Sequence, residues 1–250
     1  MDRRRATFHV KQGPAARLQV AASSVGMPLT DVQAGALVSL LDRIALERQN
    51  LTAIDEIMDG VDRHLADSIA GLAVAEPAGP LVDIGSGGGF PGLVIARLRP
   101  DLAVTLVESE GRKADWLVRA SADLPNVRVV PERTEQLARD ARGAFGTVTA
   151  RAVAGPVPTL ELAAPLVGDG GEIRIWSTPA SEADDAQIAV AADLLGFVPE
   201  GIVPVSPFTG ARRVLRRFRR VAPTRDRYPR RPGRAVSRPL RVLGSEAPPT

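Results

Sequence analysis

The chain has 250 residues, no cysteine and two histidines, His9 and His64. The lack of cysteine excludes disulfides, thiolate metal sites and cysteine nucleophiles, and two histidines make a His-built metal centre unexpected. The formal net charge is +3, yet 13 arginines and a single acid, Asp226, lie between Ala211 and Arg241. Such a basic strip on an otherwise acidic chain favours a polyanionic partner such as nucleic acid, with a solvated basic tail as the alternative.

No apolar stretch in the sequence is long enough to cross a membrane, and Met1–Arg5 lacks the apolar core of a secretory signal. We therefore expect a cytoplasmic monomer with no membrane partner and no metal. Residues 1–12 are expected to form a flexible arm.

Residues 13–75 have the pattern of a helical layer. Apolar side chains recur near a period of 3.6 between Val32 and Leu46, and Thr30 or Asp31 suits the N-cap of that helix. Further along, His64 and Asp67 share one helix face. With the neighbouring Ser68 they cannot form a catalytic triad, because three residues within one turn cannot converge as base, orienter and nucleophile. We expect instead a helix that packs on the following domain and caps its ligand pocket.

From Pro80 the pattern changes to alternating strands and helices, which is typical of an α/β domain with a parallel sheet. The predicted strands cover residues 81–84, 104–107, 127–130, 147–150, 172–176, 202–205 and 213–218. The predicted helices cover residues 91–98, 112–122 and 182–195, and a turn is predicted at 131–135. We expect one domain over residues 76–222 and a basic, Arg/Pro-rich, disordered tail over residues 223–250.

The first predicted strand ends in Asp83 and opens into a glycine-rich turn. Its glycines Gly85, Gly87 and Gly89 allow positive φ and let a ligand approach the backbone closely. The spacing of Gly87, Gly89 and Gly92 also fits the dinucleotide fingerprint. A carboxylate at Asp83 would repel a pyrophosphate, however, whereas it suits a ligand with an amine or a positive charge.

A second acid, Glu108, ends the second predicted strand and is placed to bind the hydroxyls of a ribose. The two acids and the turn together favour S-adenosylmethionine (SAM) over a nicotinamide dinucleotide. A turn that binds nothing is the remaining alternative.

Further candidates lie at the carboxyl ends of the later strands, where open parallel sheets bind ligands. Ser109 follows Glu108, and Thr134 and Glu135 are placed to offer backbone groups to an adenine. Arg151 ends the fourth strand, where a guanidinium serves a ligand or substrate more readily than the core, because a buried guanidinium needs partners.

In their order and spacing, these motifs resemble the bacterial small-subunit rRNA guanine-N7 methyltransferases, the family called RsmG or glucose-inhibited division protein B. The matching segments are Asn50–Thr52, Arg63–Ser68, Asp83–Gly92, Val107–Ser109, Arg112–Lys113, Arg133–Glu135, Arg151–Ala152 and Tyr228–Gly233. The resemblance implies an α/β fold: a Rossmann-like class I SAM-dependent methyltransferase sheet with helices on both faces and an N-terminal helical extension.

The resemblance also implies roles for individual residues. Gly85 and Phe90 would lie against SAM, and Glu108 would bind its ribose. Thr134 and Glu135 would flank the adenine. Arg151 would position the substrate near the site of methyl transfer, with no general base required. The full set of expected cofactor-binding residues is Asp83, Gly85, Gly87, Gly89, Phe90, Glu108, Ser109, Thr134, Glu135 and Arg151.

The implied partner is 16S rRNA or the small ribosomal subunit, with a guanine of the decoding-region loop as target. The arginines expected to contact RNA are Arg212, Arg213, Arg216, Arg217, Arg230 and Arg231. Two positions depart from the family pattern, since Ser177 stands where a lysine is usual and Ala150 where a serine is common. A SAM enzyme acting on a small molecule and a non-catalytic RNA-binding protein with a relic SAM pocket remain alternatives. Asp83 and the lack of a placed acid/base pair disfavour an NAD oxidoreductase.

Overall fold

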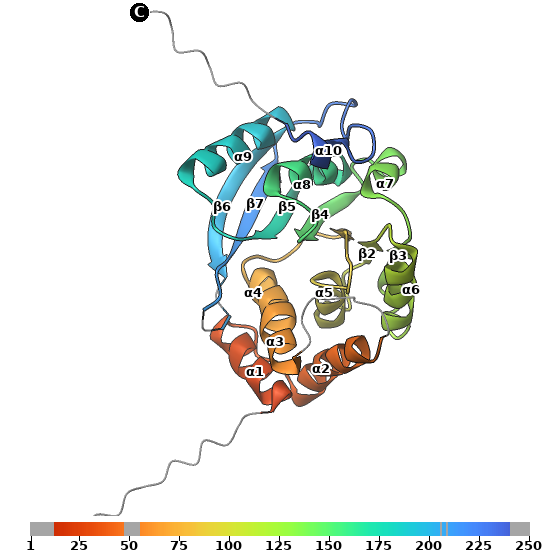
Figure 1. The fold of residues 1–250 in the computed structure, drawn as a ribbon, viewed down its shortest axis with the longest axis vertical. Helices are drawn as coiled ribbons and strands as arrows, with labels where there is room; N and C mark the ends of the chain where they lie inside the picture. Colours follow the sequence, from red (N-terminus) through yellow and green to blue (C-terminus); the bar gives the residue numbers. More distant parts are fainter. Residues whose placement is uncertain (1–12, 48–55, 206, 209, 241–250) are drawn as a thin grey trace, which may run out of the picture.

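The computed structural model describes residues 13–47, 56–205, 207–208 and 210–240. Seven strands form one sheet in the order β3-β2-β1-β4-β5-β7-β6 (Figure 1). Strands β1 to β5 pair in parallel, whereas β7 is antiparallel to both β5 and β6. The strands are β1 (Leu81–Ile84), β2 (Val104–Val107), β3 (Val127–Val130), β4 (Phe145–Arg151), β5 (Val167–Ser177), β6 (Phe197–Val205) and β7 (Arg213–Arg220).

The helices fall into an N-terminal group and a group that alternates with the strands. The N-terminal group consists of α1 (Pro14–Ser24), α2 (Asp31–Leu46), α3 (Ile57–Gly60), the π-helical turn η1 (Val61–Ala66) and α4 (Asp67–Ala73). The others are α5 (Gly92–Leu98), α6 (Gly111–Ala120), α7 (Thr134–Asp140), α8 (Pro156–Ala163), the 3-10 turn η2 (Ala164–Leu166), α9 (Glu182–Leu194) and α10 (Arg234–Ser237). As predicted, Thr30 caps α2, through a capping box with Gln33. No described helix is long and apolar enough to cross a membrane.

Helices cover both faces of the sheet, because successive side chains of a strand point to opposite faces. Leu81 joins a core with residues of α1, α2, η1, α5 and α6, whereas Val82 and Ile84 join a second core with residues of α7, α8 and α9. In Figure 1 the N-terminal helices lie together at the lower end of the view, beside α5. The fold class expected from the sequence, including its N-terminal helical extension, is therefore confirmed.

Two helices that pack on the second core, α7 and α8, are not predicted from the sequence. The sequence indicates only a turn at 131–135, where α7 begins, and no helix between Arg151 and the fifth strand, where α8 lies. Pro156 and Pro158 make α8 hard to predict from the sequence, because prolines usually break helices. They are tolerated here because they lie in the first turn of the helix. The short α7 buries only Thr134, Glu135, Leu137 and Ala138, which is too few positions for a clear period.

The segment over residues 224–240 is a second difference, because it packs on α7 and α8 and is not the disordered tail expected from its composition. Tyr228 and Ala235 are buried in the second core. The Arg142 guanidinium donates to the carbonyls of Thr224 and Tyr228. Buried apolar side chains within an Arg-rich stretch anchor it, and composition alone does not show which ones are buried. The predicted arm at 1–12, the Asn50–Thr52 motif and residues 241–250 lie outside the described residues.

Candidate active site

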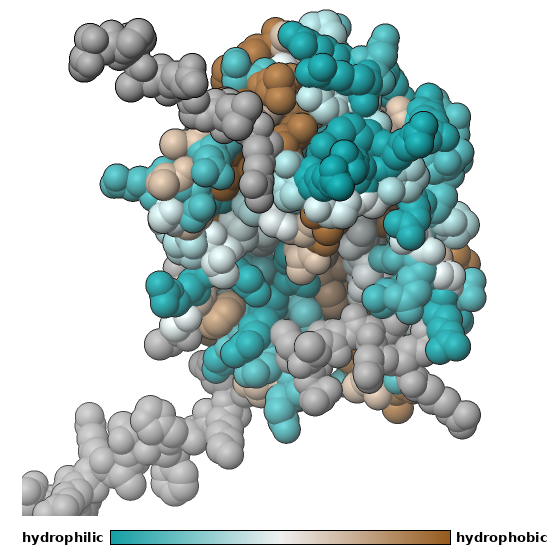
Figure 2. All heavy atoms as spheres, turned by 45° about the horizontal axis from the view of Figure 1, so that its top comes forward, coloured by the Kyte–Doolittle hydropathy of each residue, from teal (hydrophilic) through white to brown (hydrophobic). Residues whose placement is uncertain are grey.

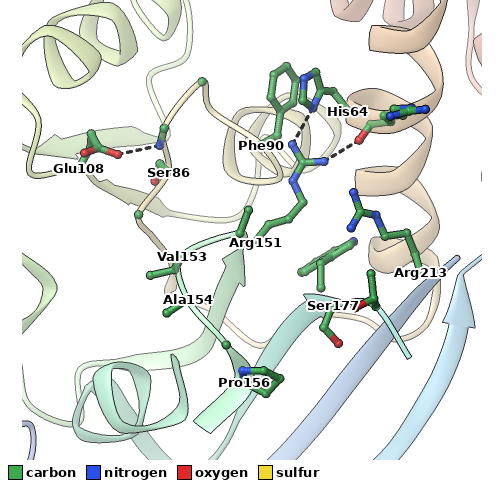
Figure 3. Close-up of a pocket in the computed structure, with 18 of the residues that line it drawn as sticks. His64, Ser86, Phe90, Glu108, Arg151, Val153, Ala154, Pro156, Ser177 and Arg213 are labelled. Atoms are coloured by element: carbon green, nitrogen blue, oxygen red, sulfur yellow. Dashed lines mark hydrogen bonds between the residues drawn. The ribbon is translucent and has the colours of Figure 1, made fainter. Parts of the chain in front are cut away.

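A cavity of about 650 Å³ opens at the carboxyl ends of β1, β2, β4 and β5. This size lies within the range of small-molecule sites, and the position matches the crevice where the strand order reverses between β1 and β4. Figure 3 shows the wall residues converging from the glycine turn, from the helix that carries His64 and from β4, β5 and β7. The lining residues are Arg63, His64, Gly85–Gly88, Phe90, Glu108, Lys113, Arg151–Pro156, Trp176–Thr178 and Arg213.

The glycine turn forms one wall of the cavity, and its conformation explains its composition. Gly85, Gly87 and Gly89 have φ of +61°, +54° and +102°, in the left-handed region that other residues rarely adopt. A Cβ on Gly85 would also lie 2.8 Å from Cγ2 of Val153, on the opposite loop. Gly85 and Gly87 line the cavity as predicted, whereas Gly89 packs against Leu93 behind it.

Asp83 lies beneath the turn and does not line the cavity. Its carboxylate accepts hydrogen bonds from the Gly92 N–H at 3.2 Å and from the Thr149 hydroxyl at 2.8 Å, and the residue is 1% exposed. Burial raises the pKa of this carboxyl to about 6, against the lowering effect of these hydrogen bonds. The expectation of direct ligand contact is therefore corrected: Asp83 ties the start of α5 to β4 and supports the turn from below.

Glu108 does reach the cavity, at the end of β2. Its carboxylate accepts from the N–H of Gly87 at 2.9 Å (Figure 3) and also from the N–H of Glu110 at 2.8 Å. It therefore bridges the glycine turn and the start of α6, with one edge on the cavity. Lys113, which also lines the cavity, pairs with Glu110.

Three of the expected cofactor-binding residues, Ser109 and the two adenine-side residues Thr134 and Glu135, lie apart from the cavity. Ser109 is exposed, and Thr134 and Glu135 are buried at the start of α7 without lining it. The Glu135 carboxylate accepts from the N–H of Gly233, in the C-terminal segment. Contacts between these three residues and a cofactor stay predictions.

Arg151 lies at the centre of a polar cluster on the far wall. Its Nη1 donates to the Arg63 carbonyl at 2.7 Å and its Nη2 donates to Nδ1 of His64 at 2.8 Å (Figure 3). Nη1 also donates to the Asp67 carboxylate at 3.2 Å. The His64 ring stacks on Phe90 with centroids 4.5 Å apart and planes 4° apart. Burial, followed by the nearby charge of Arg151, lowers the pKa of His64 to about 3, so the imidazole is neutral at pH 7.

The cavity therefore combines residues that sequence reasoning found with others that it missed. The helix over residues 57–73 borders the cavity as expected, but the contact between Asp67 and Arg151 was not foreseen. The loop from Ala152 to Pro156 was also missed, although its place after the fourth strand was an available signal. Ala152 has a φ of +57°, a strained conformation for a residue with a Cβ that often marks functional loops.

The six arginines expected to contact RNA divide into two groups. Arg216 is 1% exposed and bonds to Ser177 and Asp185; Arg217 pairs with Glu172 and Glu200, and Arg230 pairs with Glu161. Arg216 is too buried to reach an RNA, so the prediction is corrected for this residue. Carboxylates compensate the charges of Arg217 and Arg230, and RNA contact by these two arginines stays a prediction. Arg212 and Arg231 are exposed, and the Arg213 side chain lines the cavity without a hydrogen bond or ion pair to any residue that the structure describes. For these three residues, RNA contact stays a prediction.

In the described part of the chain, no group of three or more His, Asp or Glu side chains could hold a metal ion.

The sheet order, the glycine turn at the switch point and the acid at the end of β2 define a class I SAM-dependent methyltransferase fold. The crystal structure of the Pyrococcus horikoshii protein PH0793 shares this fold, with a TM-score of 0.50 and 13% identity over 61% of each chain.

Sequence comparison gives the family within this class. Residues 33–198 match the GidB family, described as rRNA small subunit methyltransferase G, and the chain belongs to this family. It is 41% identical to the ribosomal RNA small subunit methyltransferase G of Roseiflexus castenholzii, over 77% of this chain and 85% of that protein. It is 36% identical to the protein of the same name from Deinococcus radiodurans, over 91% of this chain and 94% of that protein.

Proposed function

We propose that this chain transfers the methyl group of SAM to N7 of a guanine in 16S rRNA, in the decoding-region loop. The observation that supports the proposal most strongly is the cavity between Glu108 and Arg151, at the point where the strand order of the sheet reverses. The chain also belongs to the rRNA small subunit methyltransferase G family. The relatives named above are methyltransferases of small-subunit ribosomal RNA by name, and the basic segment after β6 supplies positive charge for an RNA partner.

The residues present fit SAM. Gly85 and Gly87 line the cavity with positive φ and no side chain, so a flat, extended ligand can lie against the backbone. Glu108 offers a carboxylate edge for two ribose hydroxyls, and Phe90 offers an apolar contact. When bound, SAM supplies an electrophilic methyl group on a positively charged sulfur.

The protein's own residues then have to position the acceptor and need not remove a proton. Guanine N7 carries a free lone pair and no proton, so no general base is required. The one histidine of the cavity agrees with this, because His64 has a pKa of about 3 and its Nδ1 accepts a hydrogen bond from Arg151. Arg151 and Arg213 lie on the cavity wall, and their positively charged guanidinium groups are placed where a base or phosphate would enter.

RNA presents N7 in a deep and narrow major groove, so the target guanine has to lie in a loop or an opened helix. The exposed arginines Arg225, Arg227, Arg231, Arg234 and Arg238 lie in the C-terminal segment. Figure 2 turns the upper end of Figure 1 forward and shows strongly hydrophilic residues over this region. We take this surface as part of the RNA-facing side.

The test is incubation of the purified chain with SAM labelled on its methyl group and with either small ribosomal subunits or naked 16S rRNA. The proposal predicts label on one guanine, removed when the rRNA is treated with the reductive cleavage chemistry that is specific for N7-methylguanine. Label on a different base atom, or transfer to small molecules but not to RNA, would contradict it. SAM binding without transfer to any RNA would indicate a relic pocket.

A further inference from the structure

The helix over residues 57–73 brings two side chains to the reaction site that neither the glycine turn nor the sheet supplies. His64 and Asp67 come from η1 and α4, whereas the group that they contact, Arg151, ends β4 more than 80 residues later. The contact therefore joins the N-terminal helices to the cavity wall. Trp176 of β5 strengthens this junction, because its indole N–H donates to the Asp67 carbonyl at 3.1 Å.

The guanidinium is held in one orientation. Its two terminal nitrogens make three contacts, to the Arg63 carbonyl, the Asp67 carboxylate and Nδ1 of His64. A guanidinium can only donate, so Nδ1 must carry a lone pair and the His64 ring must have its proton on Nε2. The ring is itself fixed by stacking on Phe90, which also lies 5.5 Å from the Arg151 guanidinium carbon.

A gain in folding stability does not explain why Asp67 is buried beside Arg151. Asp67 is 0% exposed, burial raises the pKa of its carboxyl, and its Oδ1 has no hydrogen-bond partner among the described residues. A buried carboxylate with an unsatisfied oxygen is costly, and apolar packing of similar volume is usually at least as stable as a buried ion pair. The local helix is also a π turn, a form that is frequent at functional sites. The need to orient Arg151 explains the free-energy cost of burying the Asp67 carboxylate better than a gain in stability does.

We propose that His64 and Asp67 are positioning residues for methyl transfer, holding the guanidinium of Arg151 in the orientation that receives the target nucleotide. His64 acts as a neutral hydrogen-bond acceptor on a stacked ring, and Asp67 acts as the counter-charge. The inference rests on the proposed function, and it makes the N-terminal helices part of the active site.

Two substitutions at His64 separate its two contacts. His64→Phe keeps an aromatic ring on Phe90 but removes the acceptor, whereas His64→Asn places an amide oxygen near the position of Nδ1 and removes the stacking. Asp67→Asn removes the counter-charge with little change of shape. Asp62→Asn is the matched control, because Asp62 lies in the same π turn and pairs with Arg17, away from the cavity.

The measurements are the kcat for rRNA methylation and the Kd for SAM by calorimetry, with far-UV circular dichroism as the folding check. We expect His64→Phe and Asp67→Asn to lower kcat roughly 10- to 100-fold, because a small misplacement of a positioning group has effects of this size. The Kd for SAM should stay within about threefold, and His64→Asn should keep kcat within about fivefold of the wild type. Wild-type kcat in His64→Phe and Asp67→Asn, or equal losses in His64→Asn and His64→Phe, would overturn the proposal.

A readout that needs no RNA separates this inference from the proposed function. The terminal Nη–Hη signals of Arg151 in NMR should be resolved and slowly exchanging in the wild type and in Asp62→Asn, because both terminal nitrogens are hydrogen-bonded, and they should be averaged in His64→Phe. A wild type that methylates no guanine N7 would contradict the proposed function. An Arg151 signal that is unaffected by His64→Phe would contradict the positioning role on its own.

Discussion

Arg151 directs its hydrogen bonds to one helix and presents the rest of its guanidinium to the cavity. This placement explains why an arginine can sit at the end of a buried strand: a counter-charge, a carbonyl and a neutral ring nitrogen replace the water that it would otherwise need. It also explains why His64, in contact with a cation and largely buried, does not serve as a base.

Replacement of Arg151 tests its role in the reaction directly. Arg151→Ala should lower kcat for rRNA methylation roughly 100-fold, because the group that orients the target is removed, while the Kd for SAM rises less than about fivefold. Arg151→Lys should also be impaired, because a single ammonium cannot contact both the Asp67 carboxylate and the His64 ring as the planar fork does. Full activity in Arg151→Ala would remove this residue from the site.

Asp83 gives a prediction about pH. Its folded pKa of about 6 lies above the usual 3.8, so the native state holds this proton more tightly than the unfolded chain. The contribution of Asp83 to stability is therefore lost as pH rises from about 4 to about 6. Urea unfolding should show the wild type losing roughly 1–3 kcal/mol relative to Asp83→Asn across this window. Parallel stability curves for the two proteins would contradict the assignment.

At this scale the sequence predicts which residue types meet at the sheet edge, but not which of them face the cavity. Gly85, Glu108 and Arg151 could be found because they end strands or form the turn between them. The placement of Asp83 beneath the turn depends on the Thr149 hydroxyl of the neighbouring strand. The pairing of Arg216 with Asp185 depends on a helix 31 residues away in the chain, and no local pattern reports that contact.

Among the elements, α8 and the C-terminal segment are held together by one buried acid. Glu161 of α8 is 0% exposed and accepts hydrogen bonds from the backbone N–H, Nε and Nη2 of Arg230. The same segment donates from Gly233 to Glu135, at the start of α7. The segment thus reaches the edge of the sheet where an adenine is expected to bind, although neither α7 nor the segment lines the cavity.

Glu161→Gln should loosen this segment without unfolding the domain. A neutral amide leaves the partly buried Arg230 without its counter-charge, and we expect the free energy of unfolding to fall by about 2 kcal/mol. Trypsin should cleave between Arg225 and Arg238 at least several-fold faster than in the wild type. The matched control is Asp123→Asn, which removes an exposed partner of Arg97 in α5. Equal cleavage rates in the wild type and Glu161→Gln would show that this ion pair does not hold the segment.

The sequence predicts the elements in proportion to their length and regularity. All seven strands and the long helices α2, α6 and α9 were found, because their apolar periods are clear. The helices α7 and α8 were missed because one is short and the other begins with prolines. Order in the C-terminal segment was missed because three buried anchors, Thr224, Tyr228 and Ala235, are outnumbered by exposed arginines.

In the described part of the chain, the sheet lies between two large apolar cores, a smaller cluster forms around Trp176, and the cavity lies where the strand order reverses. The N-terminal helices share a core with α5 and α6, and through Arg63 and His64 they also line the cavity. Much of the basic charge after β6 is neutralised within the fold, and the exposed remainder includes Arg212 and the arginines of the C-terminal segment. The cavity between Glu108 and Arg151 is the site that we propose for the methyl donor.

The measurement that tests this claim most directly is calorimetric titration of the full chain with SAM, comparing the wild type with Glu108→Ala. We predict one site per chain, weakened at least about tenfold in Glu108→Ala, because hydrogen bonds from the ribose hydroxyls to a charged acceptor are lost. The matched control, Glu110→Ala, removes a neighbouring acid that pairs with Lys113 and should change the Kd by less than about threefold. No heat of binding in the wild type, or equal affinity in Glu108→Ala, would contradict the account.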